Sequence, residues 1–168
     1  MRQITKNIYS FEELSTEAKE KAIEYFRENE DYPFLKEDLE MQLEDLLKEN
    51  GIKATEAKLY YSLSNCQGDG LMFEGVFQWK NHQIEAKHSG FYCHSYSKTL
   101  EITNEEGEEA NEKTEKEFEE IYQSICEELE KNGYSIIENA LLDETIKENI
   151  LANEYKFFEN GEYFINFY

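Results

Sequence analysis

The chain has 168 residues, of which 39% are apolar and 14% aromatic, so it can form a packed core and is not an intrinsically disordered sequence. Its 38 acidic and 17 basic side chains give a formal charge of −21, which argues against direct binding to nucleic acid or to an anionic membrane surface. The N-terminus has no apolar signal segment and the three cysteines form no paired framework, so we expect a reduced, cytoplasmic setting.

Charge divides the chain into three parts. Residues 1–50 carry 14 acids and 7 bases, residues 51–104 carry 5 of each, and residues 105–168 carry 19 acids and 5 bases. No internal repeat or Pro/Gly/Ser-rich linker separates these parts. We therefore predict a single domain over 1–168, made of an acidic helical arm, a neutral β-meander and a second acidic arm.

The first arm predicts a short edge strand near Ile4–Tyr9 and then a helix. Ser10 and Glu13 have the spacing of a capping box, and Ser15 is the cap candidate for a helix over about 16–29. Apolar residues at intervals of four form one stripe on this helix: Leu14, Ala18, Ala22 and Phe26. A stripe of this period is typical of a helix that buries one face.

A second helix is predicted between Pro33 and Gly51, with its leucines on one face, and antiparallel strands follow it. The predicted strands are Lys58–Ser64, Leu71–Trp79, His82–His88, Phe91–Ser97 and Leu100–Thr103. The connections between them are short and rich in turn residues, which permits antiparallel neighbours and leaves no room for crossover helices.

The second arm predicts a polar loop over Asn104–Asn111, a long helix over about 112–131 that ends at Gly133, and a shorter helix near 140–152. A hairpin with Asn160-Gly161 in a type I′ turn closes the chain. The predicted fold class is therefore α+β, an antiparallel meander flanked by amphipathic helices.

Histidine and cysteine give no catalytic or metal-binding pattern. The three histidines, His82, His88 and His94, are six residues apart, about 20 Å along one strand, so we interpret them as polar residues on a solvated sheet face. The cysteines, Cys66, Cys93 and Cys126, are interpreted as structural, with Cys66 the best candidate for a nucleophile. We expect no metal, no cofactor and no enzymatic activity.

The segment Ser64–Gly70 contains Gln67-Gly-Asp-Gly70, in which two glycines surround Asp69. One interpretation is a wide turn in which the Asp69 carboxylate accepts hydrogen bonds from nearby amides. The other is a binding loop that presents Asp69, with Gln67 and Asn65, to a partner or an ion. Both interpretations stay open on the sequence alone.

The acidic stretch 105–130 is the most distinctive feature, with twelve glutamates against two lysines. Four of them are expected on successive turns of the long helix, about 6 Å apart: Glu112, Glu115, Glu119 and Glu120. Such a row could imitate the phosphates of a nucleic acid and bind a basic protein. The alternative is a solvated face that confers solubility.

Two segments resemble small acidic proteins encoded by phages and prophages. They are the opening Tyr9-Ser-Phe-Glu-Glu-Leu-Ser-Thr-Glu-Ala-Lys-Glu-Lys-Ala-Ile23 and the element Leu63–Gly75, which contains Gln-Gly-Asp-Gly and Phe-Glu-Gly. The resemblance covers about residues 8–95 and, more weakly, 153–155. It implies a phage gene acting in a bacterial host cell, a class in which anti-CRISPR and antitoxin-like proteins are common, and it supplies no catalytic residues.

The leading hypothesis is a non-catalytic anti-defence inhibitor that binds a basic host protein, such as a CRISPR effector or another defence nuclease. Its expected partner-binding residues are Glu112, Glu115, Glu119, Glu120, Gln67 and Asp69. The alternative is an antitoxin or regulatory protein-binding module in which an aromatic sheet face matters more than charge. A second alternative, a metal- or Cys-dependent enzyme, would use Asp69, Cys66 and the histidines.

Overall fold

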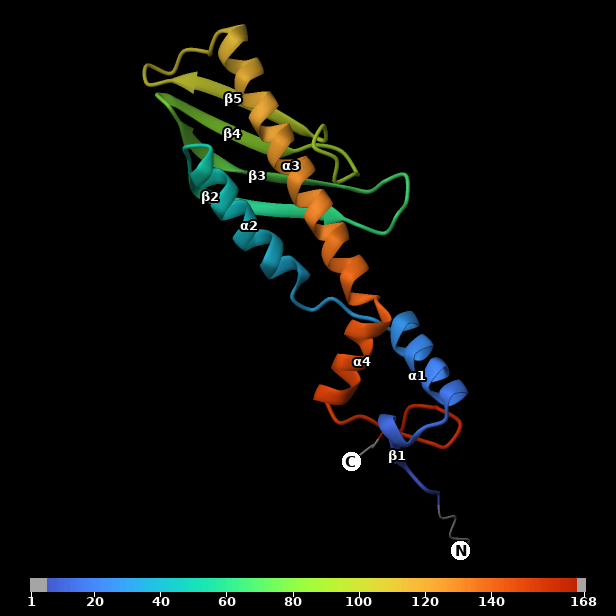
Figure 1. Ribbon diagram of the computed structural model, residues 1–168. Coiled ribbons are helices and arrows are strands. Elements are labelled where there is room, and N and C mark those ends of the chain that lie inside the picture. The colour runs from blue at the N-terminus through green and yellow to red at the C-terminus, as the bar shows by residue number, and fades with distance from the viewer. Residues whose placement is uncertain (1–5, 166–168) are drawn as a thin grey trace, which may run out of the picture. The chain divides into compact units, whose positions relative to one another are not determined.

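The computed structural model describes residues 6–165 and has an α+β fold, as the sequence predicts (Figure 1). In chain order the elements are β1 (Tyr9–Ser10), a 3-10 turn (Phe11–Glu13), α1 (Thr16–Glu28), α2 (Leu35–Glu49), β2 (Ile52–Ser62), β3 (Gly70–Trp79), β4 (His82–His88), β5 (Lys98–Asn104), α3 (Glu112–Ala140), α4 (Asp143–Ala152) and β6 (Lys156–Phe157).

These elements form two compact units, each with a buried core. One unit comprises 33–135, and the other comprises the chain before 33 together with the chain after 135, so α3 has residues in both. The parts predicted from the sequence, divided after residues 50 and 104, were defined by charge, and their boundaries differ from those of these two units. The single-domain organisation stays a prediction.

The unit of residues 33–135 is built on a four-stranded antiparallel meander in the order β2-β3-β4-β5. Side chains of neighbouring strands meet in register on one face, where Phe77 lies beside Ile84 and Ile84 beside Ile102. All three are buried. Figure 1 shows α3 lying across the sheet and α2 running along β2, so these helices cover the apolar face.

The helices of this unit bury the predicted stripes. In α2 the buried residues are Leu35, Leu39, Leu43 and Leu47, and in α3 they include Phe118, Tyr122, Ile125 and Leu129. The predicted stop at Gly133 is wrong, because α3 continues to Ala140. Gly133 instead allows close packing, since a Cβ atom there would lie 2.5 Å from Cδ1 of Leu63.

The predicted strand Phe91–Ser97 is also wrong. This segment belongs to a loop, Ser89–Ser97, that joins β4 to β5 and is closed by the Ser89 amide donating to the Ser97 carbonyl at 2.8 Å. The aromatic residues Phe91, Tyr92 and Tyr96 gave it strand character, but all three are exposed rather than packed on a sheet. We call Ser89–Ser97 the aromatic loop.

In the other unit, α1 and α4 pack together beside the two-stranded sheet β1-β6. The Ser15 hydroxyl caps α1 by accepting from the Ala18 amide, and Glu13 accepts from the Ser10 amide at 2.7 Å, as predicted for these residues. Of the predicted edge strand, Tyr9 lies in β1 and Ile4 lies outside the described residues. The predicted helix near 140–152 is α4, which begins three residues later.

The C-terminal turn differs from the predicted type I′ geometry. Only Gly161 of the Asn160-Gly161 pair has a positive φ, +81°. The Gly161 amide donates to the Phe158 carbonyl, and the Phe158 amide donates to the Glu162 carbonyl, which is a longer hairpin turn with glycine at its left-handed position. Glycine is also required sterically, because a Cβ there would lie 2.2 Å from the Ala18 carbonyl oxygen.

Candidate functional site

Asp69 is the last residue of the loop Leu63–Asp69 between β2 and β3, which we call the Asp69 loop, and it is buried. Its Oδ2 atom accepts from the Tyr134 hydroxyl at 2.6 Å and from the amides of Ser64 and Cys66 at 2.6 and 3.0 Å. Its Oδ1 atom accepts from the Ser62 hydroxyl at 2.9 Å and contacts the Cys66 thiol at 3.1 Å. These bonds, led by that of Tyr134, hold the pKa of Asp69 well below its usual range.

This geometry favours the turn interpretation of the Gln-Gly-Asp-Gly segment, because the carboxylate of Asp69 already has partners on both oxygens. The side chain of Gln67 is exposed. Gly70 permits the loop to close, since a Cβ there would lie 2.9 Å from the Cys93 carbonyl oxygen and from Nδ1 of His94. A partner-binding role of Gln67 or Asp69 stays a prediction.

The aromatic loop packs on the Asp69 loop. The ring of Tyr92 lies beside Gly68, where a Cβ would approach it to 3.1 Å, and His88 Nε2 contacts the Tyr92 carbonyl at 3.1 Å. Although the loop is held at these points, Phe91 is fully exposed and Tyr96 is 72% exposed. A structured loop with exposed aromatic side chains is a candidate protein-binding surface, because aromatic residues dominate interface hot spots.

Glu119 differs from the other glutamates of the predicted acidic row. It forms an ion pair with Lys98 at 2.7 Å, and the Lys98 side chain is only 3% exposed. Lys98 also donates to the Ser95 carbonyl at 2.8 Å and lies 4.6 Å from the centre of the Tyr122 ring. Glu119 therefore neutralises a buried lysine within the unit.

The remaining members of the row, Glu112, Glu115 and Glu120, are exposed and form no ion pair within residues 6–165. They do not share one face. Given 100° of rotation per residue, Glu115 lies on the side of α3 that faces the sheet, whereas Glu120 lies on the outward side with Lys113 and Lys116. The four glutamates thus form no continuous row.

A denser acidic cluster precedes the helix. Between β5 and α3, four exposed glutamates lie within five residues: Glu105, Glu106, Glu108 and Glu109. Asn104 organises this segment, because its Oδ1 atom accepts from the amides of Glu106 and Glu108 at 2.9 Å each. We call Glu105–Glu112 the acidic turn. In the sequence, this turn is indicated by Asn104 three residues before Gly107, a spacing typical of a turn stabilised by an asparagine side chain.

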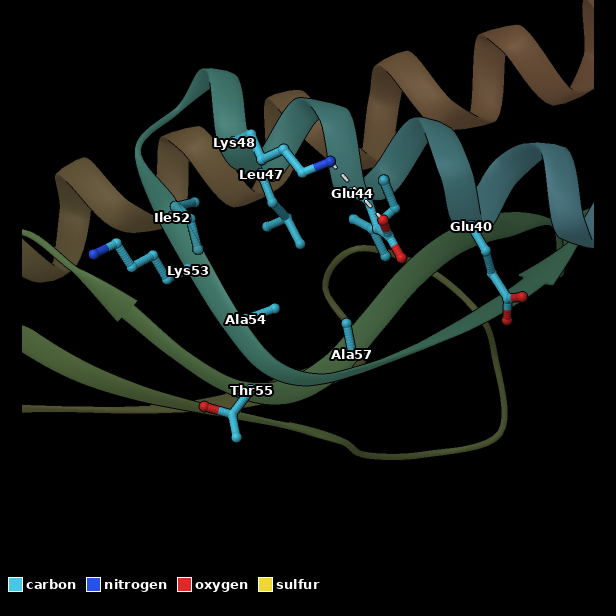
Figure 2. Close-up of a pocket in the computed structure, with 10 residues that line it drawn as sticks. Glu40, Glu44, Leu47, Lys48, Ile52, Lys53, Ala54, Thr55 and Ala57 are labelled. Carbon is cyan, nitrogen blue, oxygen red and sulfur yellow. Dashed lines mark ion pairs between the residues drawn. The ribbon is translucent and has the colours of Figure 1, made fainter.

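A groove of about 650 Å³ lies between α2 and β2 (Figure 2). Its apolar lining comes from Leu43 and Leu47 of α2 and from Ile52, Ala54 and Ala57 of β2. Charged side chains stand at its rim: Glu40, Glu44, Lys48 and Lys53. No sequence pattern indicates this groove, because alanines in a strand carry no recognisable binding signal.

The three cysteines differ in exposure: Cys66 is exposed, Cys93 is partly buried and Cys126 is buried. Burial raises the pKa of Cys93, and it raises the pKa of Cys126 to about 12, so both thiols are protonated at neutral pH. Cys66 is exposed and contacts Asp69. Among residues 6–165, no group of three His, Cys, Asp or Glu side chains is placed to hold a metal ion.

Comparison with protein-family models, curated proteins and solved structures finds no match to the chain. The resemblance to phage-encoded proteins therefore depends on the sequence segments that carry it. Within the described part of the chain, no helix has the length and apolar character needed to cross a membrane.

Proposed function

We propose that the chain is a non-catalytic anti-defence inhibitor that binds a basic, nucleic-acid-handling host protein, such as a CRISPR effector, through an acidic surface that imitates nucleic acid. The observation that carries this proposal is the acidic turn, whose carboxylates are exposed, close together and held on an ordered backbone. A charged surface that is already ordered loses little conformational entropy on binding.

The overall charge supports the same proposal. Ion pairs among residues 6–165 involve ten carboxylates, out of the 38 in the chain. Most acidic side chains are therefore available to an external cation. Such a field accelerates association with a basic partner and repels nucleic acid itself.

The acidic turn supplies the residues to vary. A variant with Gln at Glu105, Glu106, Glu108, Glu109 and Glu112 removes five charges and keeps side-chain size. The matched control removes five exposed charges from the other unit, at Glu17, Glu20, Glu28, Glu148 and Glu154. Both variants have the same net charge, so any difference between them reports the position of the charges.

The test begins by immobilising the chain, exposing it to bacterial lysate and identifying the retained proteins. We expect a basic nucleic-acid-binding protein that excess duplex DNA or guide RNA displaces. The acidic-turn variant should bind it at least about tenfold more weakly than the control variant, with a smaller dependence on salt. Retention that is unaffected by saturating nucleic acid would contradict the proposal.

The antitoxin or regulatory alternative is favoured by a different observation, the exposure of Phe91 and Tyr96 in the aromatic loop. The aromatic sheet face that this alternative invoked is buried, since Phe73, Phe77 and Trp79 lie in the core. A Phe91→Ser/Tyr96→Ser variant distinguishes the two. Loss of binding in this variant, with full binding in the acidic-turn variant, would favour the alternative.

A further inference from the structure

The outer edge of β2 has no strand partner within residues 6–165, because β2 is the first strand of the order β2-β3-β4-β5. Its residues from Lys53 to Lys58 are all exposed. An edge strand presents unpaired amide and carbonyl groups, which are a template for another extended chain. The opposite edge differs, since Glu109 pairs with Thr103 of β5.

A β-bulge shapes the side of β2 that faces α2. Ala54 pairs with Phe77 and Ala57 pairs with Gly75, so the three residues 75–77 of β3 oppose the four residues 54–57 of β2. Phe77 and Gly75 lie on the same face of β3 because they are two residues apart. Ala54 and Ala57 therefore both face α2, although in a regular strand they would face opposite sides.

Gly75 makes this bulge possible. A Cβ at Gly75 would lie 1.9 Å from the carbonyl oxygen of Glu56, which no side chain could accommodate. The Phe-Glu-Gly element of the sequence thus ends in the residue that lets the bulged edge strand approach β3.

The groove is open to solvent over Ala54 and Ala57. Figure 2 shows Leu47 pointing from α2 toward β2, with Ala54 and Ala57 pointing toward the helix and Thr55 pointing away. Ala54 and Ala57 remain exposed despite facing α2. A volume of about 650 Å³ next to an unpaired backbone edge has room for the side chains of an added strand.

The rim of this groove carries charges of both signs, Glu40 and Glu44 against Lys48 and Lys53, so it is the net charge of the chain that favours a basic occupant. Glu40 and Glu44 line it from α2, and their ion pairs with Lys36 and Lys48, at 3.5 and 3.9 Å, are exposed. Exposed ion pairs contribute little stability, so both carboxylates can exchange these partners for others. A chain with charge −21 also repels a second copy of itself and attracts a cationic segment.

We propose that the groove between α2 and β2 binds an extended, basic segment of a partner protein, which adds as a strand to the outer edge of β2. Aliphatic side chains of the segment lie over Ala54 and Ala57, and basic side chains face Glu40 and Glu44. The proposal shares with the proposed function only the basic character of the partner, and it does not depend on the acidic turn.

The probe is a fluorescein-labelled octapeptide of alternating lysine and valine, and the control peptide alternates glutamate and valine. Binding is followed by fluorescence anisotropy, and its location by amide hydrogen exchange of the intact chain. We expect the lysine–valine peptide to bind and to slow exchange at Lys53–Lys58, while the glutamate–valine peptide does neither.

Two pairs of variants test the groove itself. Ala57→Trp fills it and should weaken lysine–valine binding about tenfold or more, whereas Ala152→Trp, at an exposed alanine of α4, should leave it unchanged. Glu44→Lys should weaken binding severalfold compared with Glu37→Lys, which changes an exposed glutamate of α2 outside the groove. Unchanged exchange protection in β3 shows that each variant is folded.

Three results would overturn the proposal. The first is no protection of β2 at peptide concentrations up to roughly 1 mM, which corresponds to negligible affinity. The second is equal or tighter binding of the glutamate–valine peptide. The third is protection of β2 that rises with protein concentration without peptide, which would identify a second copy as the occupant. The acidic-turn variant should bind the peptide normally, so the two proposals can fail separately.

Discussion

At the scale of single residues, two buried polar groups hold the sheet unit together. Asp69 accepts hydrogen bonds from residues that precede it in the chain, between Ser62 and Cys66, and from Tyr134 of α3. The hydroxyl of Tyr122 accepts from the Phe73 amide at 3.0 Å and donates to the Phe73 carbonyl at 2.6 Å. Pairing of β3 with β4 extends only from Gly75 onward, so Tyr122 satisfies backbone groups of β3 that β4 does not reach.

The first prediction concerns the Asp69 carboxylate and pH. Because its pKa is lower in the folded chain than in the unfolded chain, its contribution to the free energy of unfolding is complete above the unfolded pKa of about 4 and is lost as pH falls through the folded pKa. Asp69→Asn should destabilise the fold at pH 7, because the amide NH₂ group would face donors. Urea unfolding should show that the free energy of unfolding differs less between the unsubstituted chain and the Asp69→Asn variant at pH 3 than at pH 7.

Tyr134 provides the matching control for this prediction. Donation to Asp69 raises the pKa of the Tyr134 hydroxyl to about 12, so the hydroxyl stays protonated throughout this range. Tyr134→Phe should cost about 1–2 kcal/mol at pH 7, the loss of one hydrogen bond to a charged group. A stability difference for Asp69→Asn that is independent of pH would contradict the assignment.

The second prediction concerns Tyr122. Tyr122→Phe leaves the amide and the carbonyl of Phe73 without their buried partner, and it should lower the free energy of unfolding by about 2–4 kcal/mol. Denaturant titration measures the loss. The substitution should increase the hydrogen-exchange rate of the Phe73 amide more than that of the Phe77 amide, because Phe77 lies where β3 pairs with β4.

At the scale of elements, α3 combines structural and surface glutamates within one turn. Glu119 pairs with the buried Lys98, while its neighbour Glu120 is exposed on the outward side. Periodicity alone assigned both residues to one acidic row. Lys98 of β5 distinguishes them, because the packing of α3 on the sheet brings Glu119 to Lys98.

The third prediction separates these two neighbours. Glu119→Gln leaves the ammonium group of Lys98 buried without a countercharge and should cost about 1–3 kcal/mol. Glu120→Gln should change stability by no more than about 0.5 kcal/mol, as is usual for surface substitutions. Thermal unfolding of the two variants checks this difference. Equal stability of both variants would mean that the Lys98–Glu119 pair contributes nothing to the fold.

At the scale of the whole molecule, like-charge repulsion opposes folding. Ten of the 38 carboxylates are in ion pairs within residues 6–165, and the basic side chains of the chain leave a formal net charge of −21. Repulsion between such charges is long-ranged at low ionic strength and is screened within about 10 Å at 0.1 M salt.

The fourth prediction is that salt stabilises the chain without ion specificity. The melting temperature should rise by several degrees from roughly 20 mM to roughly 500 mM sodium chloride. Magnesium or calcium chloride at the same ionic strength should give a similar rise, because no group of three His, Cys, Asp or Glu side chains among residues 6–165 is placed to hold a metal ion. A larger rise with either divalent ion would reveal a carboxylate metal site and contradict the expectation of no cofactor.

Local periodicity and short-range hydrogen bonds are enough to predict the α+β class, the stripes of α1, α2 and α3, the meander and the serine cap of α1. The roles of Gly133, Glu119 and Asp69 could not be predicted in this way, since each depends on a residue distant in the chain. The aromatic loop misled the prediction for the same reason: strand propensity is realised only where a neighbouring strand is available. The groove beside β2 likewise arises from a bulge that depends on Gly75, a contact between strands that local sequence patterns do not encode.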